Sequence, residues 1–245
     1  MLLRSRRLIP FVTFVLLLSS AALADSVMGN GSFQSGWSAS NNGSTFFNHV
    51  SWDGNGMNIG FCLAGGSTCN FSGQPGMALP VFAGANFSAP GSFYISPSGG
   101  SGAALMIEVA GLSNSNQFGW YLVGSDPTNG ANRHPLFLGP QTAGAISNFN
   151  PSGSYGFYIL AGGTTLYTST LYGGAKDQHF ALFQSQPGGA FWVGVEDLGL
   201  RTGDRDYNDM VIKITPVPEP SSLALLGTGL VGLGTLVRRK VRGAK

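Results

Sequence analysis

Five acidic side chains between positions 196 and 209 are the residues whose types and spacing best suit chemistry. The chain has only 11 acids among its 245 residues, so this short stretch is rich in them. Asn208 adds a side-chain oxygen, and positions 204, 206 and 208 share one face of an extended segment. Carboxylate and amide oxygens bind Ca²⁺, which takes about 6–8 of them. The stretch therefore predicts a Ca²⁺ site whose ligands are Glu196, Asp197, Asp204, Asp206, Asn208 and Asp209.

A metal ion is one of two ways to hold these acids together. Like charges at short range repel one another, so the cluster needs a counter-charge. Arg201 and Arg205 lie in the same stretch, and the acids could instead cap turns and pair with them. The loop is not an EF-hand, because Asp209 stands where that loop needs glycine and Thr215 where it needs glutamate. The sequence leaves both alternatives open.

The rest of the sequence gives little evidence of a catalytic site. The three histidines, His49, His134 and His179, are isolated and lack the paired spacing of a zinc site. The G-x-S-x-G motif of nucleophilic hydrolases does not occur in the sequence. Glu108 and Glu196 lie in apolar runs, but their spacing does not say whether they face each other as glycosidase carboxylates do. We therefore expect a protein that is not an enzyme, with an extracellular glycan hydrolase as the alternative.

Short apolar runs between turn residues predict an all-β domain around the acids. The chain contains 38 glycines and only 10% charged residues, and glycine disfavours helices. The paired residues Gly162-Gly163 predict a two-residue hairpin turn. Strands at this spacing predict a single β-sandwich or jelly-roll-like domain over residues 25–215. The runs are Thr45–Trp52, Asn58–Leu63, Ser92–Ile95, Ala103–Ala110, Phe118–Val123, Pro135–Leu138, Tyr155–Ala161, Thr164–Thr170, His179–Phe183, Phe191–Glu196 and Asp209–Ile214.

Cys62 and Cys69 are the only two cysteines. In an exported chain such a pair predicts a disulfide, and the glycines at 65 and 66 suit the tight loop it would close. A metal pair and free thiols are the alternatives. A zinc site is disfavoured because it needs four ligands and no histidine is adjacent.

Both ends of the chain carry the patterns of export signals. Residues 1–24 combine Arg4, Arg6 and Arg7 with a short apolar run and Ala22-Leu23-Ala24, which predicts a signal peptide cleaved between Ala24 and Asp25. The apolar run falls short of the roughly 20 residues of a membrane span, which disfavours an uncleaved anchor. At the other end, a proline-rich linker at 216–222 precedes an apolar segment at 223–237 and a basic tail at 238–245. This pattern predicts a transmembrane helix whose tail stays in the cytoplasm.

The C-terminal pattern is also specific to one class of sorted proteins. Pro218-Glu219-Pro220, the short apolar span and the arginine-rich end resemble the PEP-CTERM sorting signal of Gram-negative bacteria. The resemblance implies an exosortase as a transient partner, which would process the tail near these three residues. It implies a chain held in the inner membrane by its C-terminal helix and then released to the cell surface or the extracellular space. Such proteins are typically tied to exopolysaccharide and biofilm.

The acidic stretch carries a second resemblance. Its Glu196-Asp197-Leu198 and its later acids resemble a calcium-type signature near the end of a bacterial secreted domain of unknown function. The later matching residues are Asp204, Asp206, Tyr207, Asn208 and Asp209. The resemblance implies a β-sandwich with a metal-binding or structural acidic loop, and no known catalytic activity.

Charge and aromatic content narrow the expected partners. Five basic and ten acidic residues lie between Asp25 and Pro216, a net charge of −5, so the whole chain's charge of +2 comes from its ends and nucleic-acid binding is not expected. Trp37, Trp52, Trp120 and Trp192 could stack on sugar rings where exposed, although strand tryptophans more often pack in a core. We therefore expect a Ca²⁺-stabilised surface protein associated with extracellular polysaccharide. The further alternative is a purely structural or adhesive protein without metal.

Overall fold

The part of the chain that the computed structural model describes is built from β-strands. The described residues are 25–29, 59, 63, 79–83, 91–97, 101–108, 113–172, 178–185, 189–197 and 207–216, with single residues at 227, 229 and 232. Residues 24–217 form one compact unit, and residues 1–23 with 218–245 form a second. All the described strands belong to the first unit, where every described pair within a sheet is antiparallel. The predicted all-β class is therefore confirmed.

The first sheet, called sheet A here, has the strand order β1-β3-β8-β5-β6, and β9 pairs with the same edge of β8 as β3 does. Two short 3₁₀ helices flank β5: η1 (Ser113–Ser115) precedes it and η2 (Gly130–Asn132) lies in the loop between β5 and β6. The strands of sheet A are β1 (Ser26–Gly29), β3 (Phe93–Ser96), β5 (Gln117–Leu122), β6 (His134–Leu138), β8 (Tyr155–Ala161) and β9 (Thr164–Tyr167).

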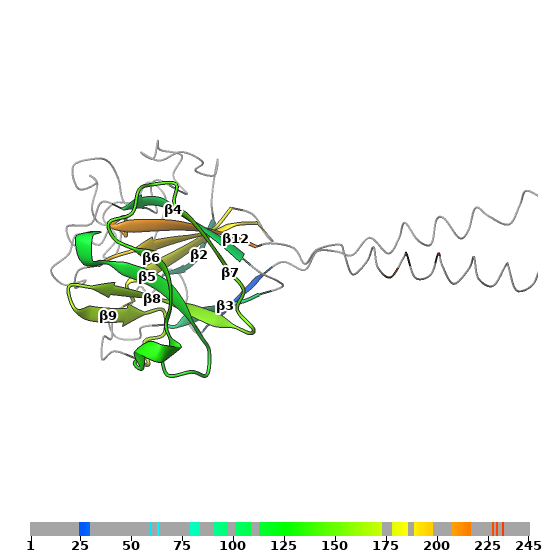
Figure 1. The fold of residues 1–245 in the computed structure, drawn as a ribbon, viewed down its shortest axis with the longest axis horizontal. Helices are drawn as coiled ribbons and strands as arrows, with labels where there is room; N and C mark the ends of the chain where they lie inside the picture. The colour runs from blue at the N-terminus through cyan, green and yellow to red at the C-terminus, as the bar shows by residue number, and fades with distance from the viewer. Residues whose placement is uncertain are drawn as a thin grey trace, which may run out of the picture. The chain divides into compact units, whose positions relative to one another are not determined.

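The second sheet, sheet B, has the strand order β2-β10-β11-β12-β4-β7. In Figure 1 its strands β4 and β12 lie above β5, β8 and β9 of sheet A, so the domain has two layers. The strands of sheet B are β2 (Leu79–Ala83), β4 (Ser101–Glu108), β7 (Ile146–Phe149), β10 (Phe180–Gln184), β11 (Phe191–Val195) and β12 (Met210–Pro216).

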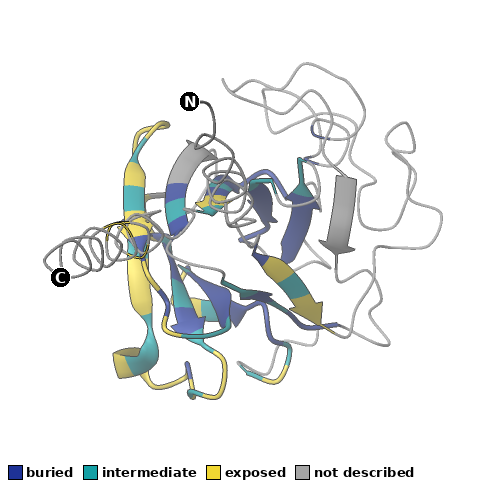
Figure 2. Ribbon diagram, turned by 90° about the vertical axis from the view of Figure 1, so that its right-hand side faces the viewer, coloured by how far each residue is buried: buried dark blue, intermediate teal, exposed yellow. Residues whose placement is uncertain are grey.

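One apolar core joins the two sheets in a sandwich-like arrangement. Alternate residues of each strand point to the same face, and those facing inward are aromatic or branched. Figure 2 shows the buried residues on strands of both layers. Sheet A contributes Phe93, Ile95, Phe118, Phe137, Tyr155, Phe157, Ile159, Ala161 and Leu166, and sheet B contributes Ala103, Phe149, Phe180, Leu182, Phe191, Val193, Val195, Met210, Ile212 and Ile214.

The outer face of sheet A is also covered. Tyr121, Tyr158 and Tyr167 form a buried aromatic cluster there, separate from the main core. The loop between β5 and β6 packs over it: the Tyr167 hydroxyl donates to the Pro127 carbonyl at 3.0 Å, and the Arg133 guanidinium lies 5.7 Å from the centre of the Tyr158 ring. This loop therefore covers the second face of β8, a strand whose residues are buried on both sides of the sheet.

Most expected strands are present with small shifts at their ends. The run Tyr155–Ala161 is β8, and Ala161 pairs with Thr164 across Gly162-Gly163. Both glycines have positive φ, 53° and 83°, as the predicted two-residue turn requires. Strands β1, β2 and β7 were not among the expected runs; β7, for example, is short and two of its four residues are polar.

The predicted strand Asn58–Leu63 is wrong at the two positions that the structure describes. Ile59 and Leu63 are helical and fully or almost fully buried. Their separation of four residues places both apolar side chains on one face of a helical turn. Ile59 lies against β11, since a Cβ built on Gly194 would be 3.0 Å from its Cγ2 atom.

Several predicted features lie outside the described residues and stay predictions. These are the Cys62–Cys69 disulfide, the strand Thr45–Trp52, the signal peptide at 1–24 and most of the segment at 223–237. Asp25, the first residue after the predicted cleavage, is buried and accepts a hydrogen bond from Ser101 Oγ at 3.3 Å. Among the described residues, no helix has the length and apolar character needed to cross a membrane.

Buried tyrosines predict that stability falls at high pH. Burial raises the pKa of Tyr121, Tyr155 and Tyr158, for Tyr158 to about 12. The protonated tyrosines contribute fully to the free energy of unfolding below pH 10, the ordinary tyrosine pKa. This contribution is lost as the pH rises through the raised pKa values of the folded state. We expect the free energy of unfolding to drop by roughly 1 kcal/mol per pH unit for each such tyrosine above pH 10. Denaturant titrations from pH 8 to 12 measure it, and a flat profile would contradict the burial.

Candidate metal centre

The acidic stretch is positioned by the pairing of β11 with β12. These strands are antiparallel neighbours in which Gly194 lies opposite Val211. The residues that follow β11 therefore meet the residues that precede β12 at the same end of sheet B. Apolar side chains of both strands enter the core, and this burial fixes where the polar ends must lie.

Asp197 and Asp209 are brought together at this end. The backbone N–H of Asp197 donates to Asp209 Oδ2 at 2.7 Å. Both side chains are buried, with 6% of Asp197 and 5% of Asp209 exposed. A short hydrogen bond to an ionised carboxylate is stronger than one between neutral groups, so it locks the two strand ends to each other.

Asn116 is a third member of this group that the sequence did not reveal. It lies between η1 and β5 of sheet A, and its Nδ2 donates to Asp197 Oδ2 at 3.1 Å. Its side chain is 2% exposed. The two residues are 81 positions apart, and a single asparagine in a polar turn carries no spacing signal that would connect them.

Glu196 and Asn208 are fully buried near the same strand ends. The Glu196 backbone is held by His179: its N–H donates to the His179 carbonyl at 3.0 Å, and its carbonyl lies 3.0 Å from His179 Nδ1. Asn208 forms an isolated parallel bridge with Val195. His179, one of the three isolated histidines, therefore anchors the chain next to the acids.

The six predicted ligands fall into three groups in the structure. Asp197 and Asp209 are in contact, Glu196 and Asn208 are buried close by in the chain, and Asp204 and Asp206 lie outside the described residues. Within the described part of the chain, no three carboxylate, histidine or cysteine side chains come close enough to hold a metal ion. Asp197 and Asp209 carry carboxylate oxygens and Asn116 carries an amide oxygen, and these are the oxygen types that hard cations prefer.

Tyr207 fixes the loop end that leads into these residues. It is fully buried, and its hydroxyl donates to the Gln178 carbonyl at 2.9 Å. Its φ of 57° is left-handed, a conformation that costs about 1–2 kcal/mol for a residue with a Cβ. Gly194 permits the approach, since a Cβ there would lie 2.7 Å from the Tyr207 carbonyl oxygen. The buried ring and its hydrogen bond therefore hold a strained backbone beside β11.

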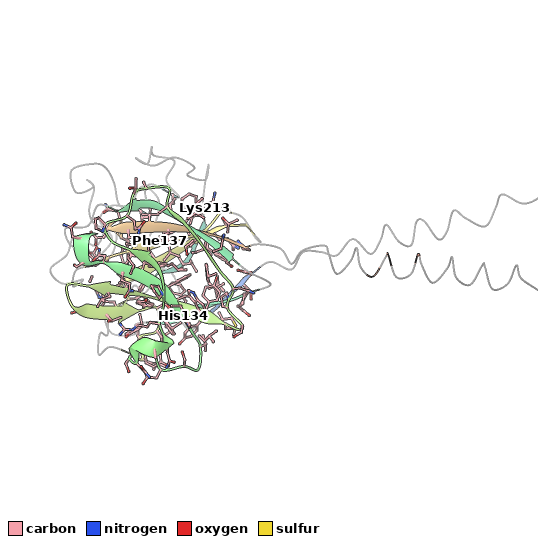
Figure 3. The ribbon with its side chains drawn as sticks, viewed as in Figure 1. His134, Phe137 and Lys213 are labelled. Carbon is pink, nitrogen blue, oxygen red and sulfur yellow. The ribbon has the colours of Figure 1, made fainter. Side chains whose placement is uncertain are left out.

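Two tryptophans considered as sugar contacts are described, and both are packed. The ring of Trp192 is buried beneath the Lys213 ammonium, which lies 5.4 Å from its centre. Trp120 is half-buried and stacks on the His134 ring with centroids 4.1 Å apart. Figure 3 labels His134 and Phe137 on β6 and Lys213 on β12. Trp37 and Trp52 lie outside the described residues.

Comparisons with known proteins match two parts of the chain. Residues 112–216 match a domain of unknown function (DUF4114), and residues 216–240 match the PEP-CTERM protein-sorting motif. No curated protein and no solved structure matches the chain. The first match begins just before Asn116 and ends just after Asp209, so it contains the whole described polar group. The predicted resemblance to a PEP-CTERM protein with a secreted domain of unknown function is therefore confirmed.

Gly194→Ala should disrupt the strand end that carries the acids. The added methyl group would collide with the Tyr207 carbonyl and with Ile59. Overpacking of this kind costs about 1–3 kcal/mol. Denaturant unfolding of the full chain in detergent measures the change in the free energy of unfolding. Gly153→Ala is the matched control, because a Cβ there has no atom within 4 Å. Equal stabilities of the two variants would contradict the close approach.

Proposed function

This chain carries a PEP-CTERM protein-sorting motif directly after a domain of unknown function, and we propose that it is an exported, non-catalytic surface protein whose domain is stabilised by Ca²⁺. The sorting motif is the observation that carries the proposal. It supports export, a membrane-anchored C-terminus before processing, and exosortase-dependent sorting to the outside of the cell.

The sequence of the tail suits a processing event that happens away from the folded domain. The linker contains Pro216, Pro218 and Pro220, and proline-rich linkers are typically semi-rigid spacers, which suits a cleavage point that an enzyme must reach. The apolar segment at 223–237 would hold the chain in the inner membrane until the exosortase acts. Its basic tail would remain on the cytoplasmic side.

The Ca²⁺ part of the proposal is supported by the burial of Asp197 and Asp209 at one end of sheet B. An ionised carboxylate removed from water needs strong compensation, either from hydrogen bonds or from a cation. When bound, Ca²⁺ would supply a charge that two adjacent carboxylates share. Glu196, Asn208, Asp204 and Asp206 complete the predicted ligand set.

Association with extracellular polysaccharide is the part of the proposal that rests on the sorting motif alone. Because Trp192 is buried and Trp120 is stacked on His134, polar groups rather than these rings would have to contact a sugar. A purely structural or adhesive protein without metal is the alternative for the same sorted chain. A non-catalytic role is in keeping with the complete burial of Glu196, one of the two glutamates considered for glycan hydrolysis.

Replacing Pro218-Glu219-Pro220 by three alanines should block processing of the tail. In the native host, we expect the variant to accumulate as the longer, membrane-associated form, while the wild-type protein reaches the surface or the medium in a shorter form. Intact-mass measurement of membrane and extracellular fractions distinguishes the two forms. The matched control replaces Ser221 and Ser222 by alanine, which leaves the motif intact. Normal processing of the triple-alanine variant would overturn the sorting proposal.

Ca²⁺ should raise the melting temperature of the full chain purified in detergent. A ligand at 100 times its dissociation constant stabilises by about 2.7 kcal/mol, which corresponds to a rise of roughly 5–10 °C for a domain of this size. Asp209→Asn should lose most of the rise, because it removes one of the two buried carboxylate charges.

Asp126→Asn is the matched control for this measurement, since Asp126 is an exposed turn residue that accepts hydrogen bonds from Thr128. It should keep the full response to Ca²⁺. A wild-type melting temperature that is the same in Ca²⁺ and in excess chelator would mean that Arg201 and Arg205 supply the counter-charge instead.

A further inference from the structure

The amide of Asn116 is satisfied at only one of its two ends. Its Nδ2 donates to Asp197 Oδ2 at 3.1 Å, whereas its Oδ1 is buried without a hydrogen-bond partner among the described residues. A buried acceptor that makes no hydrogen bond costs about 1–3 kcal/mol. The residue is 2% exposed, so bulk water does not relieve that cost. An electropositive group beside this oxygen would remove the free-energy cost of the unmade hydrogen bond.

The backbone around Asn116 holds the amide in place. The Asn116 carbonyl accepts a hydrogen bond from the Gly139 N–H at 2.7 Å, which ties the turn before β5 to the end of β6. The side chain is tied to Asp197 at the end of β11. Asn116 is therefore fixed from both sheets, and its oxygen is positioned before any ligand arrives. Such preorganisation reduces the entropy lost on binding.

The neighbours of Asn116 favour a cation over a hydrogen-bond donor as the missing partner. Asn116 donates to Asp197, and the Asp197 backbone N–H donates in turn to Asp209, so two carboxylate side chains lie at this end of the sandwich. Ca²⁺ is bound by carboxylates together with neutral carbonyl oxygens, including those of asparagine side chains. The rival reading is that Asn116 acts only as a donor that orients Asp197, in which case its oxygen plays no part.

We propose that Asn116 supplies a neutral oxygen ligand to the Ca²⁺ held by Asp197 and Asp209. The inference rests on the proposed Ca²⁺ role and adds a ligand from outside the acidic stretch. It also changes what the ion does, because Asn116 precedes a strand of sheet A while both aspartates flank strands of sheet B. The ion would join the two layers at one end of the sandwich and not only close a loop.

Two substitutions distinguish Asn116 as a Ca²⁺ ligand from Asn116 as only a hydrogen-bond donor to Asp197. Asn116→Ala removes both ends of the amide and should weaken Ca²⁺ binding by at least about tenfold, as loss of an important group at a metal site does. Asn116→Asp removes the donor but keeps an oxygen and adds charge. It should lower the melting temperature in chelator, because three carboxylates then repel, and should show a larger rise on adding Ca²⁺ than the wild-type protein.

The measurements are titration calorimetry with CaCl₂ and thermal unfolding in Ca²⁺ and in chelator, on the full chain in detergent. Asn114→Ala and Asn114→Asp are the matched controls, because Asn114 is exposed in η1 two residues away. Both should respond to Ca²⁺ as the wild-type protein does.

Each outcome supports or overturns the ligand role of Asn116. If the wild-type protein binds Ca²⁺ and Asn116→Ala binds it equally well, the ligand role of Asn116 is overturned while the Ca²⁺ proposal stands. If Asn116→Asp loses the response that the wild-type protein shows, Asn116 is only a donor to Asp197. If the wild-type protein itself does not bind Ca²⁺, both proposals fail together.

Discussion

Pairing between β11 and β12 is the interaction on which the rest of this domain depends. The two strands lie in the middle of sheet B, and nine of their twelve residues are buried. Their antiparallel register determines which residues meet at the strand ends, because a shift of one position would exchange the inward and outward faces. The apolar core thus selects the register, and the register brings Asp197 to Asp209.

Polar groups at the end of these strands are held by specific contacts. Asp209 receives the Asp197 N–H, Asp197 receives the Asn116 amide, and the Glu196 backbone is bonded to His179. None of these contacts belongs to the regular hydrogen bonding of a β-sheet. Each therefore depends on where a loop lies, and the packing of the core determines the position of that loop. Strain is concentrated here as well, at the left-handed backbone of Tyr207. Strain of this kind persists where the surrounding structure holds it, and it is frequent at binding sites.

The sequence was informative where local chemistry decides the structure. Continuous apolar runs such as Tyr155–Ala161 must be buried on both faces, and Gly162-Gly163 can adopt the positive φ of a tight hairpin. The acidic stretch was found because its charge density is unusual. Asn116 could not be found in this way, since its role comes from a contact 81 residues away. Ile59 and Leu63 were misassigned because two apolar residues in a short segment suit a strand and a helical turn equally.

The position of β12 has a mechanical consequence for a chain whose sorting tail follows it. The last residue of β12, Pro216, is also where the sorting motif begins. Along its length β12 is bonded to β4 on one side and to β11 on the other. A pull on the tail is therefore resisted by two ladders that are loaded along the strand. An edge strand leading to the tail would resist the same pull with one ladder only. Two ladders therefore oppose extraction of β12 when its C-terminal end is pulled along the strand.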